Sequence, residues 1–79
     1  MNNQQKTNGL LKIGELATAT NESIPTIRFW TSEGLLDVSD KTKGGYALYS
    51  PTMIDRVKKI RQLQENKRLF IKEIKEALG

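Results

Sequence analysis

The chain has 79 residues and a net charge of +4, a length that favours one small domain with a modest core and no room for a large cofactor pocket. It contains no cysteine and no histidine, which excludes disulfides and thiolate or imidazole metal sites and removes the commonest general base. Nothing in it resembles a signal peptide or a membrane span. We therefore expect a soluble cytoplasmic protein that needs no cofactor or metal.

The positive charge is concentrated in the last part of the chain. Residues 1–50 carry five basic and five acidic groups, whereas residues 51–79 carry eight basic and four acidic groups. Such a run is usually a solvated helix face, but part of a basic excess can also contact phosphate groups. The distribution alone leaves both interpretations open.

The first nine residues are polar and without periodicity, which predicts a disordered tail over 1–9 and a folded domain over 10–79. Residues 10–13 form a short apolar run that we expect to lie extended against a hairpin. A first helix is predicted over 13–20, because its apolar residues recur at helical spacing. Asn21 tolerates the left-handed conformation and can end this helix.

A second helix is predicted to begin at Ser23, which is a favourable N-cap, with Pro25 in the first turn. Ile24 and Ile27 are expected to form its buried stripe, with Trp30 one turn further on. A glycine at position 34 should stop the helix.

Residues 37–50 are predicted to form a β-hairpin or wing. The segment is rich in turn residues, and a glycine pair at 44–45 permits backbone conformations that other residues resist. Residues 46–50 alternate in the period-two pattern of a strand. The pattern places Tyr46 and Tyr49 on opposite faces, and we expect Tyr46 to pack near the base of the wing.

The remaining residues predict two further helices. Ser50 and Pro51 signal a helix start, and the apolar stripe that follows ends near 66–67. A last helix is predicted over roughly 70–78. The expected fold is therefore mainly α, a winged helix-turn-helix of about four helices with a small β-hairpin wing.

Four ordered segments carry a resemblance to a known family. They are Ile13-Gly14-Glu15-Leu16-Ala17, Ser23 with Thr26-Ile27-Arg28-Phe29-Trp30, Glu33-Gly34-Leu35-Leu36, and Gly45-Tyr46-Ala47-Leu48-Tyr49-Ser50. In this order and spacing the chain resembles the N-terminal DNA-binding domain of the MerR (mercury-resistance-regulator) family over residues 11–78. The resemblance implies a homodimer that binds double-stranded promoter DNA, with the second helix in the major groove and wings on the backbone, and that acts on RNA polymerase indirectly.

The second helix supplies most of the candidate DNA-binding residues. Arg28 follows the buried Ile27, points away from the core and matches the DNA-contacting arginine of the family; its planar fork can bind guanine or phosphate. Ser23 and Thr26 lie at the helix N-terminus, which favours anions, although both also have simple structural roles there.

Two aromatic residues on the same helix are further candidates. Phe29 and Trp30 stand where the resemblance implies two tyrosines. Phe29 lies off the apolar stripe, is expected to be partly exposed and lacks a hydroxyl. Trp30 keeps an N–H donor but also suits the core. Both are weighed as DNA contacts and as packing residues.

The wings supply the other candidates. Lys41, Lys43 and Tyr49 are assigned to the first wing, where Ala47 replaces the arginine that the resemblance implies. Lys67 and Arg68 are assigned to a second wing between the last two helices. Glu22 occupies a position that is usually apolar in the family, and the sequence offers no reason for it.

Three functions remain open from the sequence. The leading one is a transcriptional regulator of the MerR type, or its DNA-binding part. The second is an architectural DNA-binding protein of the same fold, such as an excision factor or a plasmid-segregation protein. The third is a winged helix that binds protein instead of DNA. Nothing supports an enzyme, because no nucleophile–base or carboxylate pairing stands out.

Overall fold

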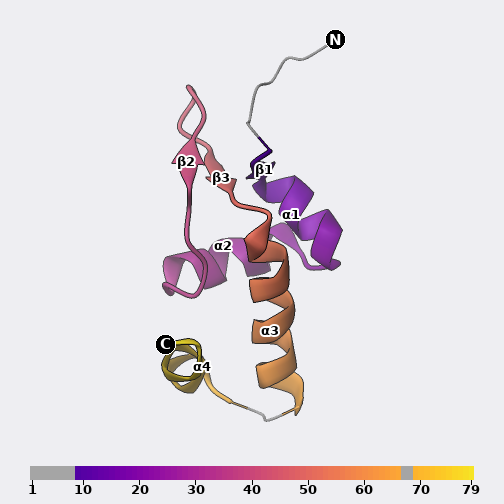
Figure 1. Ribbon diagram of the computed structural model, residues 1–79, viewed down its shortest axis with the longest axis vertical. Coiled ribbons are helices and arrows are strands. Elements are labelled where there is room, and N and C mark those ends of the chain that lie inside the picture. The colour runs from indigo at the N-terminus through magenta and orange to yellow at the C-terminus, as the bar shows by residue number, and fades with distance from the viewer. Residues whose placement is uncertain (1–8, 67–68) are drawn as a thin grey trace.

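The computed structural model describes residues 9–66 and 69–79, and Figure 1 shows the arrangement of their helices and strands. All but Gly9 of the predicted tail lies outside the described residues. The elements in chain order are β1 (Leu11–Lys12), α1 (Ile13–Thr20), α2 (Ile24–Ser32), β2 (Asp40–Lys41), β3 (Ala47–Tyr49), α3 (Thr52–Asn66) and α4 (Ile71–Leu78). The mainly α fold with four helices and a small sheet confirms the prediction.

The first two helices form a tight helix-turn-helix. Asn21 adopts the left-handed conformation (φ 58°), and the backbone N–H of Glu22 donates to the carbonyl of Ala17 at 2.9 Å. Ser23 then caps α2, because its Oγ accepts from the backbone N–H of Thr26 at 3.2 Å. The predicted ends of both helices are confirmed at this turn.

The sheet has three strands in the order β1-β3-β2, and both pairings are antiparallel. Leu11 pairs with Tyr49, which confirms that the segment after the tail lies extended against the hairpin. The hairpin, residues 40–49, is called the wing below. Its tip is closed by a hydrogen bond from the N–H of Thr42 to the carbonyl of Tyr46 (2.8 Å) and by Gly45 in a positive-φ conformation.

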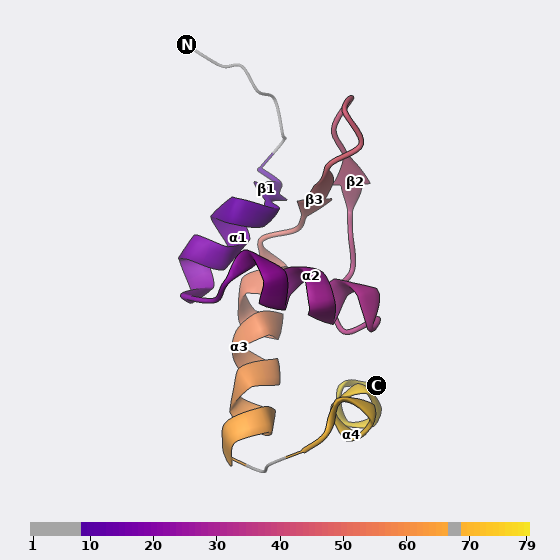
Figure 2. The same ribbon diagram turned by 180° about the vertical axis from the view of Figure 1, so that it is seen from behind.

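The third helix, α3, runs along the long axis of the molecule, as Figure 2 shows from the opposite side. Ser50 starts it as predicted: its Oγ accepts from the N–H of Thr52 at 3.3 Å. The last helix, α4, lies beside the lower part of α3 and begins where Glu73 accepts from the N–H of Phe70 at 2.9 Å. α2 crosses the upper part of α3, and the wing rises above α2.

The core draws on all four helices and on the central strand. Its most buried large side chains include Trp30 and Ile27 of α2, Tyr49 of β3, Ile60 of α3 and Ile74 of α4. Because α2 contributes two of these residues, its orientation is set by the packing of the whole domain. The predicted stripe was wrong at Ile24, which is 39% exposed because it lies in the first turn, beside Gly14 and outside the core cluster.

Candidate nucleic-acid interface

The outer face of α2 is open to solvent. Arg28 and Phe29 are exposed, with Phe29 at 49%, because the neighbouring Ile27 and Trp30 turn the opposite face into the core. At the N-terminal end, Ser23 is exposed and Thr26 is half-buried, and the Ser23 hydroxyl donates to Oγ1 of Thr26 at 2.8 Å. The groups near this end that can bind a ligand are therefore the two neighbouring hydroxyls and the exposed guanidinium of Arg28.

The wing presents the second set of charges. Lys41 and Lys43 are both exposed. They flank Thr42, whose Oγ1 accepts from the N–H of Tyr46 at 3.1 Å and so shapes the tip. The two lysines stand on the same short projection, which is the geometry required of a wing that contacts a phosphate backbone.

The two tyrosines of the wing differ from expectation in which one is buried. Tyr46, expected to pack near the wing base, is 74% exposed, and Tyr49 is 1% exposed. The ring of Tyr46 instead lies over Gly44, where an added Cβ would stand 3.2 Å from its Cε2. Tyr46 is therefore an exposed aromatic side chain at the tip of the wing. Its exposure was not predicted, because alternation places two residues on opposite faces without saying which face is covered.

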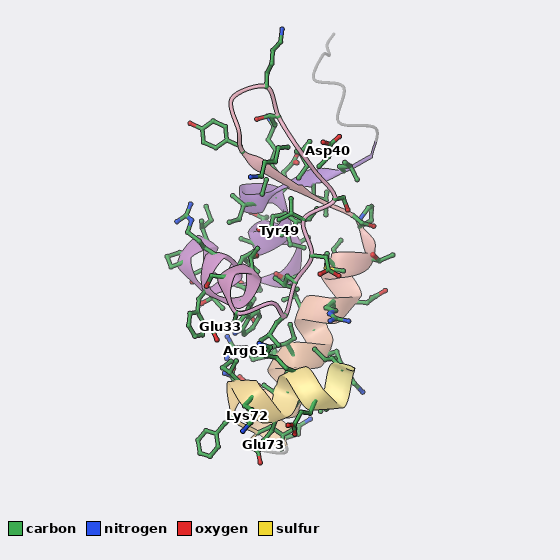
Figure 3. The ribbon with its side chains drawn as sticks, turned by 90° about the vertical axis from the view of Figure 1, so that its left-hand side faces the viewer. Glu33, Asp40, Tyr49, Arg61, Lys72 and Glu73 are labelled. Atoms are coloured by element: carbon green, nitrogen blue, oxygen red, sulfur yellow. The ribbon has the colours of Figure 1, made fainter. Side chains whose placement is uncertain are left out.

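The burial of Tyr49 and Trp30 argues against the prediction that these two side chains contact DNA directly. The Tyr49 hydroxyl lies 2.8 Å from Oγ1 of Thr31 and so joins β3 to α2 (Figure 3). Trp30 is 2% exposed. Both side chains are buried, because their large rings fill much of the small core. The candidates Lys67 and Arg68 lie outside the described residues.

A group of residues that the sequence did not connect lies behind α2. Arg61 of α3 donates from Nε and Nη2 to the two carboxylate oxygens of Glu22, at 2.9 and 2.6 Å. Its guanidinium carbon also lies 5.4 Å from the centre of the Trp30 ring. The hydrogen bonds to Glu22 raise the pKa of Arg61 above its ordinary value. Glu22 and Arg61 are 39 residues apart, and only the unexplained acid at position 22 hinted at this pair.

The electrostatic surroundings of α2 favour an anionic ligand over a cationic one. The nearest acid in sequence on its N-terminal side, Glu22, is already paired with Arg61. A shallow hollow beside the helix is lined by Pro25, Thr26, Phe29, Trp30, Arg61 and Gln64. None of these lining residues is acidic. Helix α2 itself carries one basic side chain, Arg28, and no acidic one.

The described part of the chain offers no metal site and no membrane span. Across residues 9–66 and 69–79, no three acidic, cysteine or histidine side chains stand close enough together to hold a metal ion. Within those ranges no helix is both long and apolar enough to cross a membrane. The exposed face of α2 and the wing thus remain the surface that the geometry favours for binding.

A helix-turn-helix whose second helix is exposed, followed by a charged β-hairpin, defines a winged helix-turn-helix domain. The comparison with family models agrees, since residues 11–79 match the MerR HTH family of regulatory proteins. The chain belongs to this family.

Characterised relatives extend beyond the matched region. The chain is 41% identical over 54 residues to the nodulation protein NolA of Bradyrhizobium elkanii, covering 68% of this chain and 25% of that protein. It is 37% identical over 54 residues to the mercuric resistance operon regulatory protein of Bacillus cereus, with coverage of 68% and 41%. The chain thus matches about a quarter of the first relative and about two fifths of the second.

Solved structures support the same assignment. The lead(II) complex of the transcription regulator PbrR691 from Ralstonia metallidurans CH34 superimposes with a TM-score of 0.76 at 32% identity, covering 86% of this chain and 52% of that one. HiNmlR, a MerR family regulator lacking the sensor domain and bound to promoter DNA, has a TM-score of 0.69 at 22% identity, with coverage of 85% and 52%. The second likeness concerns the fold alone.

Proposed function

We propose that the chain is the DNA-binding domain of a MerR-type transcriptional regulator and binds double-stranded promoter DNA in a sequence-specific manner. One observation carries the proposal: the outer face of α2, with Arg28 on it, is open to solvent beside a wing that bears two exposed lysines. A reading helix flanked by a phosphate-binding projection is the general arrangement of winged helix-turn-helix proteins on DNA.

Each exposed residue has a role in this proposal. Arg28 enters the major groove, where its planar fork can donate two hydrogen bonds to a guanine edge. Ser23 and Thr26 lie at the positive end of the α2 dipole, where the Thr26 hydroxyl donates to a phosphate and the Ser23 hydroxyl does so by giving up its bond to Thr26. Phe29 packs on a deoxyribose. Lys41 and Lys43 neutralise phosphates from the wing, and Tyr46 adds an aromatic surface and a hydroxyl beside them.

The oligomeric state, the cellular location and the mode of action are proposed on the same basis. The functional form is a homodimer in the cytoplasm, bound to two related half-sites, and it acts on RNA polymerase through the shape of the promoter and catalyses no reaction. Lys67 and Arg68 belong to the second wing in this proposal. The family match favours a regulator over an excision factor or a plasmid-segregation protein.

The test is a DNA titration with a duplex selected from a random pool by the chain itself. About four to six phosphate contacts should give a slope of about −4 to −5 in log K against log salt. Arg28→Ala should weaken binding to the selected duplex by about 1–3 kcal/mol and relax the preference for one base pair. Lys59→Ala, which removes an exposed lysine of α3, is the matched control. If the chain binds no duplex at low salt, the proposed function is wrong.

A further inference from the structure

The acid at the helix-turn-helix corner is almost buried and fully engaged. The Glu22 side chain is 10% exposed, and its shortest contact to Arg61 is 2.6 Å. Both carboxylate oxygens accept from the guanidinium, one from Nε and one from Nη2. A two-point contact of this kind fixes the relative orientation of the two groups as well as their separation. Glu22 is therefore held in one place although it lies in a turn.

Arg61 makes a second contact that reaches the recognition helix itself. Its guanidinium lies over the ring of Trp30, and Trp30 is one of the two buried residues of α2. Figure 3 places Arg61 just below α2, on the side that faces α4. One side chain of α3 thus contacts the turn before α2 and the inner face of α2 at once.

A third nitrogen of the guanidinium also has protein partners. Nη1 of Arg61 donates to Oε1 of Gln64 at 3.3 Å and to Glu65 at 3.5 Å. Because Glu22 already offsets the charge of Arg61 and most of the guanidinium donors have protein partners, Arg61 is poorly suited to bind a phosphate. Arg61 lies near Thr26 and Phe29, so it can instead support the residues that are proposed to contact DNA.

We propose that Glu22 and Arg61 are positioning residues for DNA recognition, which hold α2 at one fixed angle to α3 through the turn and through Trp30. The inference rests on the proposed function. Base-edge hydrogen bonds tolerate less displacement than contacts with a mobile phosphate backbone. Loosening this pair therefore reduces the preference for the selected sequence more than it reduces binding to DNA in general.

The experiment measures two affinities for each variant: one for the duplex selected by the parent chain and one for a scrambled duplex of equal length. Glu22→Gln removes the charge with little change of shape, and Arg61→Lys keeps the charge but loses the fork and the flat face. Both should lower the ratio of selected to scrambled affinity about tenfold, with an unchanged salt slope. Glu65→Gln is the matched control. It removes the charge of the other acid that contacts Arg61, which is more exposed than Glu22 and lies at the longer distance of 3.5 Å.

A second measurement separates positioning from simple loss of stability. Each variant is assayed well below its unfolding midpoint, and amide chemical shifts are compared with those of the parent. Positioning predicts shift changes along α2 in Glu22→Gln and Arg61→Lys, but not in Glu65→Gln. The double variant should be no worse than the poorer single variant, because the two residues act as one unit.

Three results would overturn the inference. Glu22→Gln could leave the affinity ratio at the parent value while the parent binds its duplex normally. Arg61→Lys could keep full discrimination, which would show that charge alone matters. Arg61→Ala could make the salt slope less negative by about one, which would make Arg61 a phosphate contact. If the parent chain binds no duplex at all, the proposed function fails and this inference fails with it.

Discussion

Helix α2 and the wing are held in very different ways, although both belong to the proposed interface. α2 inserts Ile27 and Trp30 into the core, at 0% and 2% exposure, and its first turn is capped by Ser23. The wing is anchored at its base, where Tyr49 belongs to the core cluster and Ala47 packs against it, while both residues of β2 are exposed. A rigid element suits the reading of base edges, and a less constrained one suits the following of a phosphate backbone.

Trp30→Ala should have the largest effect, because it removes the main anchor of α2. Truncating a buried aromatic side chain costs about 3–5 kcal/mol, a large part of the stability of a domain of this size. Chemical denaturation followed by circular dichroism measures the loss. Phe29→Ala, one residue away and half exposed, is the control and should cost far less. Equal losses at the two positions would mean that α2 is not held through its inner face.

Local signals in the sequence were sufficient for the ends of the elements. The left-handed Asn21, the Ser23 cap and the start at Ser50 each depend on a few neighbouring residues, and such preferences act within one turn of chain. The three-dimensional arrangement of the elements was predicted from the resemblance to the MerR family, because members of one family share the packing of elements that are distant in sequence. These parts of the fold were therefore predictable.

The errors arose where distant residues meet. Trp30 and Tyr49 were candidates for DNA contact because they lie on the second helix and on the wing, but both side chains are buried in the small core. Tyr46 was assigned the wrong side because a period-two pattern does not say which face is covered. The pair of Glu22 and Arg61 joins a turn to a helix far along the chain, and no periodicity links such positions. A departure from the family at position 22 was the one available clue.

Tyr49→Phe should have a smaller effect and sharpens the comparison, because Tyr49 joins the base of the wing to α2. The change removes the contact between the Tyr49 hydroxyl and Thr31 (2.8 Å) but keeps the ring in the core. Thr31 retains its hydrogen bond to the carbonyl of Ile27, so the loss should be about 0.5–1.5 kcal/mol by denaturation. Tyr46→Phe, at the exposed tip, should leave the stability unchanged. A larger loss at Tyr46 than at Tyr49 would reverse our assignment of the two tyrosines.

Lys43→Ala should have the smallest effect and tests the wing by itself. The side chain is exposed on the tip, so the unfolding midpoint should not move. Loss of one phosphate contact should weaken binding about equally for selected and scrambled duplexes and make the salt slope less negative by about one. Lys43→Arg should restore both values, since a phosphate contact needs the charge. If Lys43→Ala instead changed the preferred base sequence, the wing would read bases, and the division of labour between a rigid reading helix and a charged, adaptable wing would be wrong.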